Sequence, residues 1–153
     1  MDTENDNRAL KICFISQVKR EKGIIELIIS SLRLPEAEID AYGEFEGDLT
    51  KAIFYRSNVN YKGIAGDKNL RGILEGYDIL IIPRHDRNDV EVIKTAADMR
   101  LAVILSSTEG VSNVVLPERN AVILDHVSAD EIVKVIRMLE QDRTLLKGLK
   151  RNN

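Results

Sequence analysis

The segment that most constrains the fold is Tyr77–Val115, YDILIIPRHDRNDVEVIKTAADMRLAVILSSTEGVSNVV. Its pattern is typical of an apolar strand, a polar loop, a helix, a second apolar strand and a glycine-containing turn into a further helix. A helix that connects two fully apolar strands indicates a parallel sheet, which binds ligands at the carboxyl ends of its strands. The loop after Pro83 and the turn Ser106–Gly110 lie at such ends, so the sequence predicts a ligand site there.

The rest of the chain shows the same alternation. Strands are predicted at Leu10–Ser16, Glu38–Tyr42, Val59–Lys62, Asp78–Pro83, Ala102–Ser106 and Ala121–Asp125. Helices are predicted at Glu21–Arg33, Asp48–Arg56, Lys68–Tyr77, Asp89–Met99, from the capping-box sequence at Ser128 onward, and at Arg143–Lys150. This order predicts an α/β fold, with a single Rossmann-like, doubly wound parallel sheet flanked by helices. We expect one domain over residues 10–150, after a disordered polar lead-in over residues 1–9.

Composition argues against nucleic-acid binding, a membrane span and disulfide bonds. The net charge is −3 and the basic residues are spread along the chain, which argues against nucleic-acid binding. No apolar run reaches the ~18 residues of a membrane span, and the acidic start is unlike a secretory signal. The single cysteine, Cys13, lies in an apolar run, as expected for a buried thiol in a reducing compartment. We therefore expect a cytoplasmic protein without disulfides.

Several residues are candidates for ligand binding. Arg84, His85 and Arg87 follow the fourth predicted strand and form either an anion-binding loop or an exposed polar connection. Lys22 is either a phosphate ligand beside the amino end of a helix or a solvated lysine. His85 has no serine or cysteine nucleophile pattern to serve as a base for, and a structural or surface role is expected for His126. The histidines and carboxylates lack metal-ligand spacing, and no GxGxxG or Walker loop is present, so no metal site is expected.

Four segments resemble a known family. KICFISQVKREKGIIELIISSL is similar to the opening of the C-terminal domain of group 1 nucleotide-sugar glycosyltransferases of the GT-B fold, in which a strand leads to an arginine and then to a lysine–glycine pair that opens a helix. GYDILIIP resembles the family's strand ending in proline. VIKTAADMRLAVILSSTEGVSNVV resembles its helix, strand and glycine-containing turn, and ERNAVILDHVSADEIVKVIRMLEQD its final strand and helix. The resemblance spans Lys11 to Leu149 and implies one half of a GT-B fold.

The resemblance implies a nucleotide-diphosphate sugar as donor substrate, with no cofactor and no metal. Lys22 matches the family's diphosphate-binding lysine, while Gln17 stands at the position of the partner arginine. Arg87 and Thr95 stand where the family has glutamates near the donor sugar and the ribose. No catalytic residue is identified. The predicted donor-binding residues are Gln17, Lys22, Arg87, Asn88, Asp89, Thr95 and Gly110.

Two functions are consistent with this pattern. The first is the donor-binding domain of a glycosyltransferase, inactive without an N-terminal acceptor-binding domain that is excised or separate. The second is a non-catalytic pseudo-glycosyltransferase scaffold or partner subunit, which the residues Gln17, Arg87 and Thr95 motivate. A receiver-type signalling domain fits less well, because the first strand ends in Ser16 and Gln17 rather than in an acidic pair.

Overall fold

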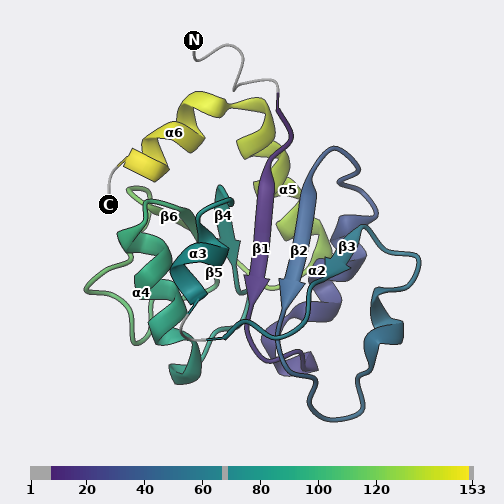
Figure 1. Ribbon diagram of the computed structural model, residues 1–153. Helices are drawn as coiled ribbons and strands as arrows, with labels where there is room; N and C mark the ends of the chain where they lie inside the picture. The colour runs from purple at the N-terminus through teal and green to yellow at the C-terminus, as the bar shows by residue number, and fades with distance from the viewer. Residues whose placement is uncertain (1–7, 67–68, 152–153) are drawn as a thin grey trace.

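The chain forms a six-stranded parallel sheet with helices on both faces (Figure 1). The computed structural model describes residues 8–66 and 69–151. The strands are β1 (Lys11–Ile15), β2 (Glu38–Tyr42), β3 (Val59–Tyr61), β4 (Ile79–Ile81), β5 (Ala102–Leu105) and β6 (Ala121–Ile123). Their order in the sheet is β3-β2-β1-β4-β5-β6. This order is doubly wound, as the sequence predicts, and every strand lies within its predicted range.

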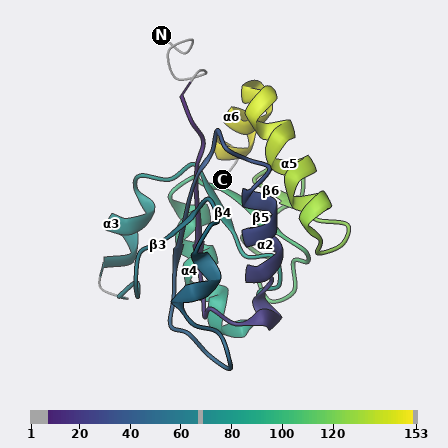
Figure 2. The same cartoon turned by 90° about the vertical axis from the view of Figure 1, so that its right-hand side faces the viewer.

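Helices cover the two faces of the sheet unequally. α2 (Ile24–Ser31) and α5 (Ala129–Gln141) pack together on one face, and α3 (Leu70–Leu74) and α4 (Val90–Asp98) on the other (Figure 2). The remaining helical elements are η1 (Arg20–Lys22), η2 (Lys51–Phe54), η4 (Arg87–Asp89) and α6 (Arg143–Arg151). Ser128 caps α5, since its Oγ accepts a hydrogen bond from Glu131 N at 3.1 Å, but the reciprocal bond of the predicted capping box is not made: Glu131 Oε2 accepts from Asp125 N at 3.0 Å instead.

The core follows from the strand sequences. β4 and β5 are buried along their whole length, as strands covered on both faces should be. β2 alternates instead, with Ile39 and Ala41 buried and Asp40 and Tyr42 half-buried on the face that holds α3. There the Tyr77 hydroxyl donates to Asp40 Oδ2 at 2.5 Å. The α3 face therefore carries polar groups that hydrogen-bond to one another, while the opposite face is apolar.

The first predicted helix is interrupted. Instead of one helix from Glu21, the chain forms the short η1, turns at Gly23 with φ +87°, and then begins α2. A Cβ atom on residue 23 would lie 2.6 Å from Pro83 Cβ, so the glycine also permits close contact with the loop after β4. This break leaves the side chain of Lys22 buried at the carboxyl-end edge of the sheet.

Two other helix predictions are wrong or too long. The helix predicted after the Gly110 turn is absent, since residues 108–115 form successive turns. The side chain of Asn120 holds the end of this segment instead: its Oδ1 accepts from Leu116 N and its Nδ2 donates to the Val114 carbonyl, both at 2.8 Å, and such side-chain bonds compete with a helix. The helix predicted at Asp48–Arg56 shortens to η2. Lys68, the predicted start of α3, lies outside the described residues.

Asp78 joins both ends of the described chain to the sheet. Of the predicted lead-in, residues 1–7 lie outside the described residues, but Arg8 makes a bidentate pair with Asp78 at 2.5 and 2.7 Å. Lys150 Nζ of α6 donates to Asp78 at 2.8 Å, and the Lys11 backbone N–H at 3.0 Å. Burial alone would raise the pKa of this carboxyl, but the hydrogen bonds from Arg8, Lys150 and Lys11 lower the pKa to about 2.

Asp78 should therefore make stability depend on acid pH. A carboxyl whose pKa is lower in the native state adds stability that is complete above its ordinary pKa of ~3.9 and is lost as the pH falls toward about 2. We expect a loss of about 2 kcal/mol across this window, and a smaller loss in Asp78→Asn. Urea unfolding at about pH 5 and about pH 2.5 measures it. Asp130→Asn, at an exposed ion pair with Arg33, is the control. Equal acid dependence of both variants would contradict this assignment.

Candidate functional site

The candidate site lies at the carboxyl ends of β1 and β4, the neighbouring strands from which the chain turns to opposite faces of the sheet. From β1 the chain runs to α2 on one face, and from β4 it runs to α4 on the other. In open α/β sheets, ligands bind in the crevice between such strands. The segments 16–22 and 82–89 form this part of the edge, and Arg84 N donates to Lys22 O at 3.1 Å between them.

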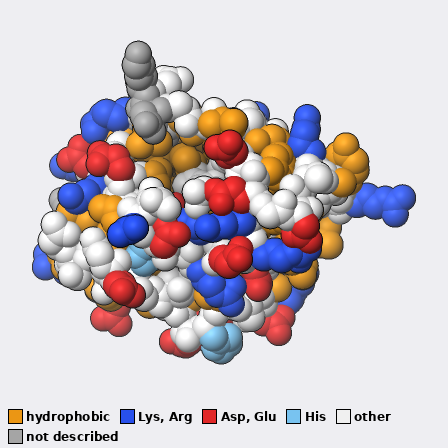
Figure 3. All heavy atoms as spheres, turned by 90° about the horizontal axis from the view of Figure 1, so that it is seen from below, with side chains coloured by type: hydrophobic (Ala, Val, Ile, Leu, Met, Phe, Trp, Pro, Cys, Tyr) orange, Lys and Arg blue, Asp and Glu red, His pale blue; other side chains and the backbone are white. Residues whose placement is uncertain are grey.

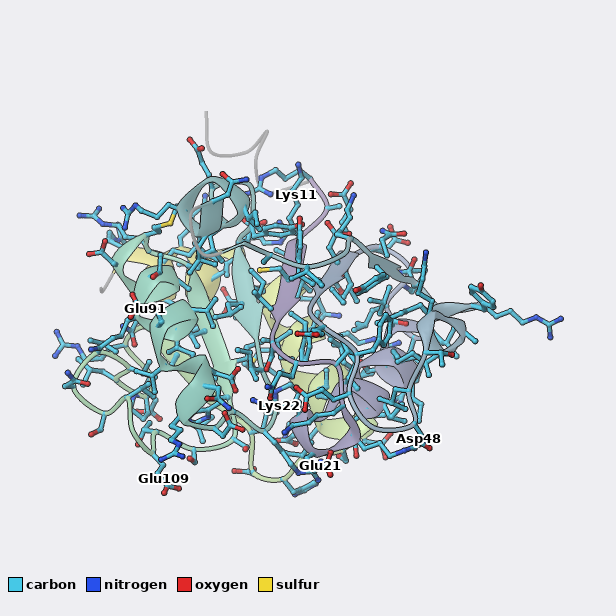
Figure 4. All side chains as sticks on the ribbon, turned by 60° about the horizontal axis from the view of Figure 1, so that its bottom comes forward. Lys11, Glu21, Lys22, Asp48, Glu91 and Glu109 are labelled. Carbon is cyan, nitrogen blue, oxygen red and sulfur yellow. The ribbon has the colours of Figure 1, made fainter. Side chains whose placement is uncertain are left out.

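Lys22 is buried at the centre of this edge and is fully paired with carboxylates. Its side chain is 1% exposed, and Nζ lies 2.5 Å from Asp89 Oδ2 and 3.0 Å from Asp86 Oδ1. Figure 4 shows Lys22 between α4 and the turn that leads into α2. Ser16 Oγ, at the end of β1, donates to the other oxygen of Asp89 at 2.6 Å. The ammonium group and Asp89 thus bridge the ends of β1 and β4.

The local sequence Asp86–Asp89 explains why two carboxylates meet here. Asp86 is the N-cap of η4 and accepts from Asn88 N at 2.8 Å, while Asp89 accepts in return from Asp86 N at 2.9 Å. This reciprocal capping box turns both side chains toward Lys22. Partial burial favours a higher pKa for Asp86, but the hydrogen bonds from Lys22 and Asn88 N–H outweigh it and hold that pKa below its usual range. Asp86 is therefore ionised at neutral pH.

A crevice of about 380 Å³ lies beside this charged group. Its polar lining is rich in hydrogen-bond acceptors, and the Oε1 atom of Gln17 is buried without a hydrogen-bond partner among the described residues. That atom has almost no exposed surface, so the acceptors that a ligand with hydroxyl or N–H groups could reach are the exposed carboxylates of Glu44 and Glu91. The polar lining residues are Ser16, Gln17, Glu44, Asn88, Asp89 and Glu91, and the apolar ones Ile15, Tyr42, Ile64, Ala65, Leu70 and Val92, with Gly43 and Gly66 between them.

A second hollow, of about 480 Å³, joins the loop after β4 to the Gly110 turn. His85, Asp86, Arg87 and Asn88 line it from one side, and Glu109 and Gly110 from the other. His85 Nε2 lies 2.7 Å from the Glu109 carbonyl oxygen, which holds the two loops together. The sequence predicts that both loops lie at carboxyl ends of strands, and in the structure they meet at that edge of the sheet.

Charges of both signs alternate across this face. Figure 3, seen from below the carboxyl ends, shows acidic and basic side chains interspersed. Arg20 pairs with Asp48 at 3.2 Å, and Lys19 with Glu46 at 3.9 Å. Arg84, one of the basic residues after β4, lies 3.5 Å from Glu26. The basic residues near the site are thus largely paired, and the edge is not a uniformly positive surface.

The predicted donor-binding residues fall into four places. Gln17 and Asp89 line the crevice, Arg87 and Gly110 line the second hollow, and Asn88 lines both. Lys22 is buried between its two carboxylate partners. Thr95 lines neither space, and its Oγ1 donates to the Glu91 carbonyl one helical turn earlier, at 2.8 Å.

Sequence reasoning missed Glu91 and Glu44. Glu91 lies four residues before Thr95, on the same face of α4 and one turn closer to the strand ends. This four-residue spacing could have identified Glu91 as a candidate for the position that the resemblance gives to Thr95. Glu44 follows β2 directly after Gly43, at a carboxyl end, which was also a signal in the strand pattern.

Two kinds of feature are absent from the described ranges. Over residues 8–66 and 69–151, no group of three or more His, Cys, Asp or Glu side chains could hold a metal ion. In the same ranges, no helix has both the length and the apolar character needed to cross a membrane.

Comparison with known proteins places the fold. No protein-family profile matches the chain, and no curated protein sequence does. Among solved structures, the C-terminal domain of a glycosyl transferase group 1 family protein (LpcC) from Francisella tularensis is similar with a TM-score of 0.76 and 17% identity, over 98% of this chain and 85% of that one. Anabaena Alr3699/HepE, solved with UDP and glucose, is similar with a TM-score of 0.78 and 13% identity, over 99% and 44%. Sucrose-phosphate synthase from Thermosynechococcus elongatus is similar with a TM-score of 0.74 and 15% identity, over 99% and 41%.

These similarities confirm the predicted fold. The chain has the architecture of the Rossmann-like C-terminal half of a GT-B glycosyltransferase, and it spans less than half the length of the two longer proteins. At such low identity the likeness concerns the fold alone.

Proposed function

We propose that this chain is a donor-binding domain of a glycosyltransferase that transfers a sugar from a nucleotide-diphosphate sugar to an acceptor. The observation that carries the proposal is the acceptor-lined crevice between the carboxyl ends of β1 and β2 and the segment that follows β4 into α4. It lies where open α/β sheets bind ligands, in a fold shared with a protein solved with UDP and glucose.

The nucleoside would occupy the crevice. Tyr42, Ile64 and Leu70 offer an apolar wall for a base, and the Glu91 carboxylate offers acceptors for ribose hydroxyl groups. We assign the ribose to Glu91 rather than to Thr95, because the Thr95 hydroxyl is already bonded to the backbone of its own helix. A carboxylate can accept from two hydroxyl groups at once, whereas one threonine hydroxyl cannot replace it.

The rest of the donor would extend into the second hollow. Its diphosphate would lie near Lys22 and the Gly110 turn, and its sugar near Arg87 and Asn88 at the start of η4. The donor is a substrate, so we propose no cofactor and no metal. Transfer would need a second, acceptor-binding domain facing this edge, and the described domain alone would be inactive. We further propose that the protein works in the cytoplasm.

Isothermal titration with UDP, GDP and their sugars tests donor binding. We expect one of the nucleotides to bind at millimolar concentration or below, and Glu91→Gln to weaken it about tenfold through loss of a charged acceptor. Glu75→Gln, an exposed glutamate at the end of α3 outside the crevice, is the matched control. The absence of binding by every nucleotide at millimolar concentration would refute donor binding by this domain.

A second candidate is a non-catalytic glycosyltransferase-like domain that serves as a scaffold or partner subunit. The pairing of Lys22 with two carboxylates favours it, because the ammonium group is already neutralised. This candidate predicts no change of melting temperature with UDP- or GDP-sugars. A ligand that binds only the native state must stabilise it, so a rise of several degrees would exclude the scaffold role.

A further inference from the structure

We infer that Asp86 is an internal competitor for anions at Lys22, so that a diphosphate binds only when the Asp86 carboxylate leaves the ammonium group. The inference rests on the proposed donor site. Lys22, Asp86 and Asp89 together carry one formal positive and two formal negative charges within direct contact distance. The place expected to attract a diphosphate is thus net negative, and an approaching phosphate meets repulsion before it meets Lys22.

The two carboxylates are not equivalent. The Asp89 side chain is 4% exposed and accepts bonds from Lys22, Ser16 Oγ and Asp86 N. The Asp86 side chain is 43% exposed and is held by Lys22 and the Asn88 N–H. Asp89 is therefore fixed in the interior, whereas Asp86 can rotate into water by breaking only its contacts with Lys22 and the Asn88 N–H.

Displacement of Asp86 would open the path for an anion. Asp86 lines the second hollow, together with Arg87 and Gly110, so its departure would expose Lys22 Nζ to that space. A neutral nucleoside in the crevice next to it would not need this step, because Asp86 does not line the crevice. Asp86 would therefore weaken diphosphate binding selectively and leave nucleoside binding unchanged.

The variant Asp86→Asn isolates this effect. Asparagine is as good an N-cap as aspartate, so the start of η4 and the fold should be kept, which circular dichroism and urea unfolding would verify. Inorganic pyrophosphate, UDP and uridine are titrated into the wild-type protein, Asp86→Asn and the control Asp98→Asn, which removes an exposed carboxylate at the other end of α4. We expect Asp86→Asn to bind pyrophosphate and UDP about tenfold or more tightly than the wild type, with uridine and the control unchanged.

The outcomes separate this inference from the proposed function. Equal UDP binding by the wild type and Asp86→Asn would overturn the inference while leaving donor binding intact. An equal gain in uridine binding would also overturn it, because the effect would not concern the diphosphate. The absence of binding by pyrophosphate, uridine and UDP to all three proteins, together with the absence of binding by GDP and the nucleotide sugars to the wild type, would overturn both.

Discussion

Replacing Lys22 by methionine should lower the free energy of unfolding by about 3–5 kcal/mol, because it leaves buried carboxylate charge without its partner. The Lys22 side chain is 1% exposed, and its main charge partner, Asp89, is 4% exposed. Water cannot easily replace the lost ammonium group at such a depth. Urea unfolding of the full chain at neutral pH measures the change.

Two variants make the Lys22 result specific. Lys19→Met removes a partly exposed ammonium group that lies 3.9 Å from Glu46, and it should cost less than about 1 kcal/mol. The double variant Lys22→Met/Asp89→Asn removes both buried charges and should recover part of the loss. A Lys22→Met protein as stable as Lys19→Met would show that the pair contributes little to the fold. If the double variant were less stable than Lys22→Met, an unpaired charge would not be the cause.

Replacing Gly43 by alanine should lower the free energy of unfolding by at least about 3 kcal/mol. Gly43 follows β2 with φ +157°, and a Cβ atom there would lie 1.7 Å from the Ser16 carbonyl oxygen. The nearest atoms that the Cβ atom would meet belong to the Ser16 backbone, so the ends of β1 and β2 would have to move apart. Ser16 also holds Asp89, and Gly43 lines the crevice, so nucleotide binding should weaken together with stability.

Gly47→Ala is the control for Gly43→Ala. Residue 47 also has positive φ, +72°, but nothing lies within 4 Å of the position of its Cβ atom. Its substitution should cost only about 1 kcal/mol of backbone strain. Urea midpoints of the two variants, with a pyrophosphate or UDP titration of the folded fraction, check the prediction. Equal losses in both would mean that backbone conformation, rather than the contact with Ser16, sets the cost.

Local pattern accounts for the parts of this protein that could be predicted. A strand buried on both faces is apolar throughout, as in β4 and β5, and a strand buried on one face alternates, as EIDAY does in β2. Both patterns can be recognised from residues that are adjacent in the sequence. The meeting of the loop after β4 with the Gly110 turn followed from the parallel order of the strands. The helix predicted after Gly110 is absent, because successive turns and the hydrogen bonds of the Asn120 side chain replace the helical pattern there.

The sequence by itself determined the parallel sheet, its doubly wound order and the edge where a ligand would bind, since these depend on periodicity and on the order of elements along the chain. Only the tertiary structure decided the chemistry of that edge. Lys22 and Asp89 are 67 residues apart, and their contact arises because β1 and β4 are neighbours and η4 turns both of its carboxylates inward. Glu91 faces the crevice while the hydroxyl of Thr95 bonds to its own helix. Side-chain pairing of this kind depends on distances between separate elements, which residue order alone does not specify.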